Sequence, residues 1–318
     1  MIPDVGVPSG VGTVRPMKVA ITGSSGLIGS SLVGALRGAG HTAVRLVRHG
    51  NPGTDEVAWD PDAGTIDAAG LEGVDAVVNL AGAGIGDERW TDERKRLILE
   101  SRTRSTDLIA RTIAGHERTP SVLLSASGID YYPDAGDEVL TEESRAGDGF
   151  LTDVCVQWEG ATAPAQEAGI RTCLLRTGIV QSADGGALKK TLLPFKLGVG
   201  GRFGSGDQWW SWISIDDHVR AMLHLIDSDI EGPVNLTAPN PVTNQAYTKA
   251  LGRELGRPTL LPIPKLGPTV LLGKELTEAL LYTSHRVLPA VLEADGFTFQ
   301  HPTIEVCLAA MLGDDEAA

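Results

Sequence analysis

The residues that point most clearly to chemistry form a glycine-rich segment, Gly23-Ser24-Ser25-Gly26-Leu27-Ile28-Gly29, followed nineteen residues later by Arg48. Glycines in this pattern let a pyrophosphate approach the backbone at the start of a helix, where unpaired N–H groups and the helix dipole attract anions. An acidic residue at position 48 would bind a ribose 2′-hydroxyl, whereas Arg48 can pair with a 2′-phosphate. The pattern therefore predicts an NADP(H) site. The alternatives are that the turn is purely structural and that Arg48 is a solvated charge at a strand end.

The flanking sequence places the glycines between a strand and a helix. Residues 18–22 form an apolar run typical of a buried strand, and apolar residues at helical spacing over 26–38 predict a helix that ends near two glycines. A second apolar strand at 43–47 delivers Arg48 to the place where the adenosine ribose would lie. This strand, turn, helix and strand order is the context that gives a glycine pattern its meaning.

Strands and helices continue to alternate through the first half of the chain. Further strands are predicted at 76–80, 121–125 and 172–176, with helices at 91–114 and 150–168. Such alternation is typical of a parallel sheet with helices on both faces, and ligands of such sheets collect at the carboxyl ends of the strands. The strand ends therefore supply further candidate cofactor residues: Leu80, Ala81, Gly82, Ser125, Arg176, Thr177 and Gly178.

We expect an α/β fold, a Rossmann-like doubly wound parallel sheet with a smaller, mostly helical C-terminal substrate domain. The predicted boundaries are a flexible leader at 1–16, an NADP(H)-binding domain at 17–180 to which 213–240 return, and a substrate domain made of 181–212 and 241–318. The reason for the last division is a change of composition after residue 181, first to glycine and tryptophan and later to leucine-rich segments broken by proline.

Composition excludes several classes of function. The net charge of −14 over 318 residues disfavours binding to nucleic acid or to anionic membranes. No segment approaches the roughly 18 continuous apolar residues of a membrane span. Cys155, Cys173 and Cys307 are widely spaced, so neither disulfides nor a metal site is predicted. We expect a cytoplasmic protein whose partner is a small-molecule substrate. Whether the chain forms a homodimer is left open by the sequence.

Several patches, in the right order along the chain, resemble the extended short-chain dehydrogenase/reductase superfamily. Within it, the likeness is to the atypical epimerase-like branch, the NAD-dependent epimerase/dehydratase or nucleoside-diphosphate-sugar epimerase type. It runs from about Met17 to Leu312 and rests on these patches besides the nucleotide turn: Asn79-Leu80-Ala81-Gly82, Ser125-Ala126-Ser127 with Tyr131-Tyr132, Gly206-Asp207-Gln208-Trp209, Trp212-Ile213-Ser214-Ile215-Asp216-Asp217 and Gly296-Phe297-Thr298-Phe299. The resemblance implies a Rossmann-like domain, a variable C-terminal domain and bound NADP(H).

The resemblance also exposes a departure from the family's catalytic pattern. It implies a Ser at the end of the fourth strand, matched by Ser127, and a Tyr-x-x-x-Lys pair that here falls on Leu151 and Cys155. Neither replacement can exchange a proton or supply a fixed positive charge near neutral pH.

Substitutes for the missing pair are available nearby in the sequence. Tyr131 and Tyr132 follow Ser127 in the same loop, and Arg102 could be the cation that lowers the pKa of a tyrosine. The alternatives are that a tyrosine only packs, that Arg102 is a surface charge, and that Ser127 caps a loop.

Aromatic residues of a later segment are the candidates for contact with the substrate. By resemblance, Gln208, Trp209 and Trp212 lie where a segment closes over the substrate, and Trp can stack on a sugar, a base or an apolar ring. The alternative is that the tryptophans anchor the small domain. Trp59 could flank the adenine or only pack, and His218 and His224, six residues apart, do not share a helix face, which disfavours a metal site.

The leading hypothesis is an NADP(H)-dependent oxidoreductase or epimerase that acts on a small carbonyl or hydroxyl compound or on a nucleotide-sugar-like one. Ser127 and a tyrosine would polarise the reacting oxygen. The alternative is an NADP(H)-binding sensor or regulatory protein that has lost catalysis, motivated by the missing Tyr-x-x-x-Lys pair.

Overall fold

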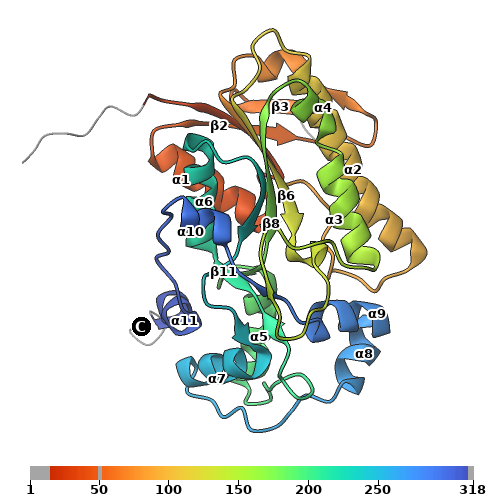
Figure 1. The fold of residues 1–318 in the computed structure, drawn as a ribbon, viewed down its shortest axis with the longest axis vertical. Helices are drawn as coiled ribbons and strands as arrows, with labels where there is room; N and C mark the ends of the chain where they lie inside the picture. Colours follow the sequence, from red (N-terminus) through yellow and green to blue (C-terminus); the bar gives the residue numbers. More distant parts are fainter. Residues whose placement is uncertain (1–14, 49–51, 314–318) are drawn as a thin grey trace, which may run out of the picture.

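The computed structural model describes residues 15–48 and 52–313, and its centre is an eight-stranded sheet (Figure 1). The leader predicted at 1–16 lies almost entirely outside the described residues. All neighbouring strands are parallel except the antiparallel pair β3 and β4. In spatial order the strands are β12 (Gly232–Leu236), β8 (Arg171–Thr177), β6 (Val122–Gly128), β5 (Ala76–Asn79), β1 (Lys18–Thr22), β2 (Thr42–Val47), β3 (Glu56–Asp60) and β4 (Thr65–Ile66).

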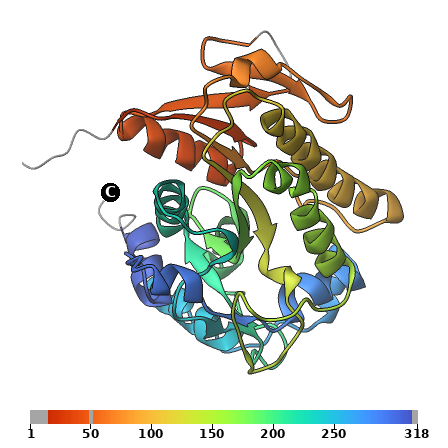
Figure 2. The same ribbon diagram turned by 45° about the horizontal axis from the view of Figure 1, so that its top comes forward.

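Helices cover both faces of this sheet, as the alternation of elements predicts (Figure 2). Val19 and Ile21 of β1 are buried in a core with α1 (Leu27–Gly38) and α6 (Ile215–Asp227), whereas Ala20 between them belongs to a second core. The second core contains residues of α2 (Asp92–Ala114) and α4 (Ala163–Glu167), together with the buried Trp59. Trp59 therefore packs in the interior, which was one of its two predicted places.

One predicted helix is two. Instead of a single helix over 150–168, the structure has α3 (Phe150–Gly160) and α4, with Thr162 before α4. Pro164 lies in the first turn of α4, where its missing N–H costs least, and it could not have donated to a carbonyl one turn earlier in a continuous helix. The sequence signal for this break is the proline itself.

The rest of the chain is mostly helical, with short strand pairs that the sequence did not indicate. The pairs are β9 (Ile179–Gln181) with β11 (Trp212–Ser214), β10 (Trp209–Trp210) with β13 (Val242–Thr243), and β7 (Val139–Leu140) with β14 (Arg286–Val287). The helices are α5 (Gly186–Lys196), α7 (Asn244–Glu254), α8 (Leu266–Leu272), α9 (Lys274–Thr277), α10 (Ala290–Ala294) and α11 (Ile304–Leu312), with 3₁₀ turns η1 (Ala68–Leu71) and η2 (Ile129–Tyr131) and the π-helical turn η3 (Glu278–Tyr282). The exact domain boundaries stay a prediction. Within the described ranges, no helix is long and apolar enough to cross a membrane.

A buried hydrogen-bond network ties together the carboxyl ends of the central strands. Asn79 at the end of β5 accepts from the hydroxyl of Thr22 at the end of β1 (2.7 Å) and donates to the hydroxyl of Thr106 on α2 (2.7 Å). The indole N–H of Trp158 on α3 also donates to Thr106 (3.0 Å), and Ser125 of β6 accepts from Asn79 (3.4 Å). Three strands and two helices thus meet through one polar cluster whose groups satisfy each other.

Removing the Thr106 hydroxyl should therefore be costly. Thr106→Ala leaves the buried Trp158 N–H without an acceptor and Asn79 with only its longer bond to Ser125, and we expect the free energy of unfolding to fall by about 2 to 3 kcal/mol. Thr103→Ala, one turn earlier on α2 and partly exposed, is the matched control and should cost under about 0.5 kcal/mol. Denaturant unfolding of both variants measures the difference; equal losses would contradict the proposed importance of the network.

Candidate active site

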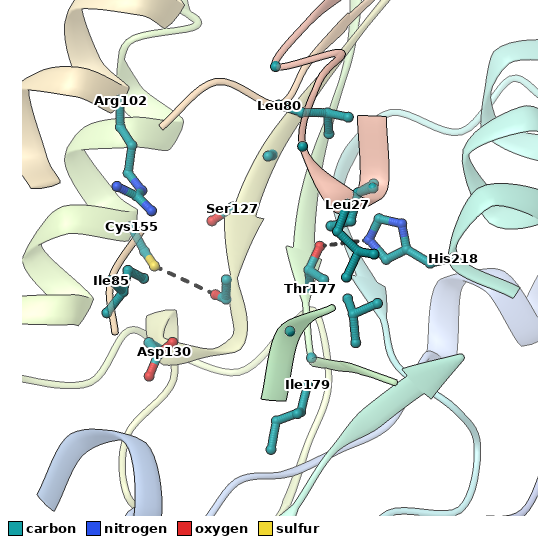
Figure 3. A pocket seen from close by; sticks show the side chains of 18 of the residues that line it. Leu27, Leu80, Ile85, Arg102, Ser127, Asp130, Cys155, Thr177, Ile179 and His218 are labelled. Carbon is teal, nitrogen blue, oxygen red and sulfur yellow. Dashed lines mark hydrogen bonds between the residues drawn. The ribbon is translucent and has the colours of Figure 1, made fainter. Parts of the chain in front are cut away.

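A cavity of about 510 Å³ lies at the carboxyl ends of the central strands (Figure 3). The turn between β1 and α1 forms one wall, and Leu80 after β5 lies beside it. Ser127 at the end of β6 and Thr177 at the end of β8 contribute further, and α3 closes another side. The chain runs from β1 to β2 on one side and reaches β5 on the other, so the cavity lies at the switch point where such sheets bind ligands.

The glycines of the turn lie so close to neighbouring backbone that side chains in their place would collide with it. Gly23 has φ +65°, and a Cβ there would lie 2.8 Å from the carbonyl oxygen of Leu80. A Cβ on Gly29 would lie 2.3 Å from the carbonyl oxygen of Gly23, so a side chain at Gly29 would push α1 off the turn. The first turn of α1 holds no acidic residue and no side-chain cap. Its positive end is therefore available to a pyrophosphate, and the residues fit that group.

The predicted cofactor residues fall into two sets, those that line the cavity and those that do not. Gly23, Gly26, Leu27, Ile28, Gly29, Leu80, Thr177 and Gly178 line the cavity. Ser24, Ser25, Ala81, Gly82, Ser125, Arg48 and Arg176 are not among its lining residues. Arg48 is exposed just beyond the end of β2, and its neighbours 49–51 lie outside the described residues.

Arg102 reaches the cavity from α2, and it is not a surface charge. Its side chain is 6% exposed, and the guanidinium carbon lies 4.9 Å from the ring centre of Trp158. Its Nη1 donates to the carbonyl oxygens of Ala83 and Ile98, both at 2.9 Å, while its Nε has no partner among the described residues. Burial lowers the pKa of Arg102 to about 10, so the guanidinium keeps its charge at neutral pH. A Cβ on Gly82 would lie 3.1 Å from this guanidinium.

Leu151 and Cys155, the residues at the positions of the missing catalytic pair, both line the cavity. The Cys155 thiol donates to the carbonyl oxygen of Gly128 (3.7 Å), and burial together with the charge of Asp130 raises the pKa of Cys155 to about 12. The thiol is therefore neutral at physiological pH and offers neither a nucleophile nor a cation.

Ser127 lines the cavity, but its proton is already used. Its hydroxyl donates to Glu159 of α3 (2.7 Å), and Glu159 accepts two further hydrogen bonds from Arg176 (2.8 and 2.9 Å). Although burial alone would lower it, the hydrogen bonds and charge of Glu159 raise the pKa of Arg176 above its ordinary value. Arg176 is thus held in a buried ion pair with side chains 4% and 10% exposed. The Ser127 oxygen keeps lone pairs that can accept a hydrogen bond from a ligand.

The two tyrosines lie behind this ion pair. The Tyr132 hydroxyl donates to Asn235 (2.7 Å) and accepts from Arg176 (3.1 Å), and burial raises the pKa of Tyr132 to about 12. The ring of Tyr131 lies 3.4 Å from the guanidinium carbon of Arg176, and neither tyrosine is among the residues that line the cavity. Their catalytic roles stay predictions that this geometry does not favour.

Of the three predicted substrate residues, the structure brings Trp209 to a cavity. Trp209 lines a second cavity of about 120 Å³, and its indole N–H donates to Asp137 (2.8 Å). Gln208 donates to the carbonyl oxygens of Phe203 and Leu281, and Trp212 is 1% exposed in the core of the C-terminal region. The last two residues hold segments together at these positions.

Two titratable residues of the cavity were not predicted as site residues from the sequence. His218 of α6 lines the cavity; burial lowers its pKa to about 4, and its Nε2 lies 3.1 Å from the Thr177 hydroxyl. Asp130 lines the cavity three residues after Ser127, in the short turn η2. The one sequence signal for Asp130 is its position in the loop between Ser127 and the two tyrosines. No group of three or more His, Cys, Asp or Glu residues that could hold a metal occurs in the described part of the chain.

Comparison with known proteins gives matches over nearly the whole chain. Residues 19–236 match the model of the NAD dependent epimerase/dehydratase family, and residues 263–311 match a domain of unknown function, DUF1731. An epimerase family protein of Mycobacterium bovis is 44% identical over 287 residues, which are 90% of this chain and 94% of the relative.

Solved structures agree with these matches. The crystal structure of human epimerase family protein SDR39U1 (isoform 2) with NADPH has a TM-score of 0.87 and 30% identity, covering 94% of this chain and 100% of the human one. A nucleoside-diphosphate sugar epimerase of Corynebacterium glutamicum has a TM-score of 0.77 and 38% identity, covering 94% of this chain and 59% of that one.

The ion pair beneath Ser127 yields a prediction on stability. Glu159→Gln keeps the side-chain size but leaves the buried guanidinium of Arg176 without its counter-ion, so we expect the free energy of unfolding to fall by about 3 to 5 kcal/mol. Glu167→Gln, on the exposed surface of α4, is the control and should stay within about 0.5 kcal/mol of the unmodified protein. Denaturant midpoints measure both. A Glu159→Gln midpoint equal to that of the control would contradict the role given to the pair.

Proposed function

The chain belongs to the NAD-dependent epimerase/dehydratase family, and from that premise we propose that it binds NADP(H) and acts as an oxidoreductase or epimerase on a small carbonyl or hydroxyl compound. One observation carries this proposal: the glycine turn and Ser127 line the same cavity at the switch point of the sheet. A cofactor held by the turn and a substrate oxygen beside Ser127 would thus share one cavity, as hydride transfer requires.

The residues of the cavity suggest how the cofactor is held. The N-terminus of α1 would bind the pyrophosphate, and Leu80, Thr177 and Gly178 would contact the rest of the dinucleotide. Arg48 would pair with the 2′-phosphate. The human relative that was crystallised with NADPH supports the phosphorylated cofactor. When bound, its nicotinamide supplies or accepts a hydride.

Arg102 would replace the charge of the missing lysine. In the family pattern a lysine lies at the position of Cys155, and here the guanidinium comes to the same cavity wall from α2. It stays charged at neutral pH because its pKa remains about 10, and its Nε lacks a partner. We therefore assign Arg102 the role of the cation that faces the cofactor ribose.

A second candidate function is a sensor that binds NADP(H) without turnover. Leu151 and the neutral thiol of Cys155 favour it, because both face the cavity where the family has its proton-transfer pair. Turnover of NADPH by any carbonyl substrate would exclude this function, whereas stoichiometric binding without turnover over a broad panel of carbonyls and alcohols would support it.

The role of Arg48 predicts a change of cofactor preference. Arg48→Asp removes the partner of the 2′-phosphate, so the affinity for NADPH should fall about 10- to 100-fold. The affinity for NADH should not fall and is expected to rise, since NADH lacks that phosphate and an acidic residue at this position can accept from its free 2′-hydroxyl. Arg37→Asp, an equal change of charge in the exposed last turn of α1, is the control. Fluorescence titration with NADPH and NADH measures the affinities of the unmodified protein and both variants. An unchanged preference of Arg48→Asp for NADPH over NADH would refute the assignment.

The role of Arg102 can be tested by moving the charge. Arg102→Asn should weaken NADPH binding about tenfold by removing a buried cation. Cys155→Lys alone should destabilise the protein, because two cations would then share one wall. Combining the two changes should restore NADPH affinity to within about threefold of the original.

Arg104→Asn is the control for this cycle, since Arg104 is exposed on the same helix and pairs with Glu100. Purely additive losses in the double variant would show that the charge at Arg102 does not act on the cofactor.

A further inference from the structure

Asp130 lies where three cavities meet. It lines the cofactor cavity, the second cavity beside Trp209, and a third of about 310 Å³ that contains Trp90 and Phe150. Of the described residues it is the one that lines all three. Its backbone is held in η2 and by the Thr152 hydroxyl, which donates to its carbonyl oxygen (2.8 Å), and its side chain lies on the same side of the strand end as Cys155 (Figure 3).

The groups around Asp130 come from three different segments. Arg102 on α2 and His285 before β14 act on its carboxyl, which in turn acts on the Cys155 thiol of α3. Arg102 is 6% exposed with an unpartnered Nε, and His285 is 7% exposed and lines the second and third cavities. Burial, only partly offset by the charges of His285 and Arg102, raises the pKa of Asp130 above its ordinary range. A carboxyl in this position can hold a proton and release it to a ligand.

The walls beyond Asp130 carry an excess of negative charge and of aromatic rings. Five carboxyl groups and no Lys or Arg are among the lining residues of the third cavity: Asp130, Asp134, Asp148, Glu275 and Glu278. Lys95 lies over the rings of Trp90 and Phe150 but pairs with Glu275, and Lys265 pairs with Glu278, whereas Asp134 and Asp148 carry no ion pair with Lys or Arg among the described residues. A diphosphate would therefore meet net negative charge, since both neighbouring lysines are already paired with carboxylates.

We propose that Asp130 is the acid–base group facing the substrate, and that the cavities meeting at its carboxyl accept a small uncharged or cationic aryl or alkyl carbonyl compound and reject nucleoside diphosphate sugars. The inference rests on the proposed function, since the hydride must come from a reduced nicotinamide. In reduction the hydride would bond to the carbonyl carbon and leave the nicotinamide oxidised, and the Asp130 proton would pass from its carboxyl oxygen to the carbonyl oxygen, giving an alcohol and an Asp130 carboxylate. A proton from bulk solvent, relayed by water in the third cavity, then restores the carboxyl, and oxidation runs in reverse.

The acid role is tested first without turnover. Infrared titration of the full chain should show protonated carboxyls that release their protons above the ordinary range, because burial raises the pKa of both Asp130 and Glu142. Asp130→Asn should remove the Asp130 part of this signal and leave the Glu142 part, whereas Asp153→Asn, exposed on α3, is the control and should retain both. A signal that is the same in Asp130→Asn as in the unmodified protein would overturn the acid role.

Stability against pH gives a second readout. Because the folded-state pKa of Asp130 is raised, the stability that its proton contributes is complete below the unfolded pKa of about 4 and is lost as pH rises through the folded pKa. Asp130→Asn cannot ionise, so its thermal midpoint should rise relative to the unmodified protein over that interval. A residue with only a structural role would instead lower the midpoint at every pH.

The substrate class is tested with matched probes on the NADPH-loaded protein. Acetophenone, its 4-trimethylammonium derivative and 4-acetylbenzenesulfonate share one carbonyl and differ in charge. Calorimetry at low salt should find the sulfonate at least about tenfold weaker than the cation. UDP-glucose should not bind. Asp134→Asn combined with Asp148→Asn should reduce the discrimination, and tight binding of UDP-glucose would overturn the proposed class.

Turnover separates this inference from the proposed function. Where a probe is reduced, Asp130→Asn should lower kcat at least about 100-fold while NADPH affinity stays within about threefold, because general acid catalysis contributes on that scale. Full turnover in Asp130→Asn would overturn this inference alone. Failure of the unmodified protein to bind NADPH would overturn the proposed function and this inference with it.

Discussion

The hydrogen bonds of Asn79 are the constraint on which the site depends. The side chain of Asn79 joins the carboxyl ends of β1 and β5 through Thr22 and reaches α2 and α3 through Thr106. The Thr22 hydroxyl in turn accepts the N–H groups of Leu80 and Ala81 (3.0 and 3.1 Å), so the loop after β5 is held against the glycine turn. Because β1 and β5 are the neighbouring strands at the switch point of the sheet, the same bonds that close the core also shape the floor of the cavity.

Charges reach this cavity from elements other than those that carry them in the family pattern. Leu151 and Cys155 of α3 are neutral, whereas Arg102 of α2 brings a positive charge and Asp130 of η2 a carboxyl group to the same space. An ion pair in contact would neutralise both groups for chemistry. Here Arg102 is held by two backbone carbonyls, and its charge and that of His285 only partly offset the burial of Asp130. Separate anchoring leaves each group able to act on a ligand.

Local patterns predicted the elements well, since a strand or helix is set by periodicity over a short window. The strands β1, β2, β5 and β8 and the helices α1 and α2 lie within a residue or two of their predicted positions, β6 runs three residues further than predicted, and β3 and β4 were not predicted. The site was harder, because a strand end does not tell which face a side chain takes. Arg176 turns to Glu159 and leaves the cavity to Thr177, its neighbour. Asp130 lies in a loop without a periodic sequence pattern, so its place at the cavity follows only from segments that are distant in the sequence and meet in the fold.

The buried ion pair also bears on which group can polarise a substrate oxygen. To donate to a carbonyl, Ser127 would have to turn its proton away from Glu159 (2.7 Å), which also balances the buried guanidinium of Arg176. Breaking a charge-assisted bond of this kind costs about 1.5 to 3 kcal/mol. Ser127 is therefore suited to accept a hydrogen bond from the substrate. A carbonyl needs a different donor, and Asp130, which holds its proton above the ordinary range of an aspartate and faces the same cavity, is the group that can supply it without breaking a structural bond.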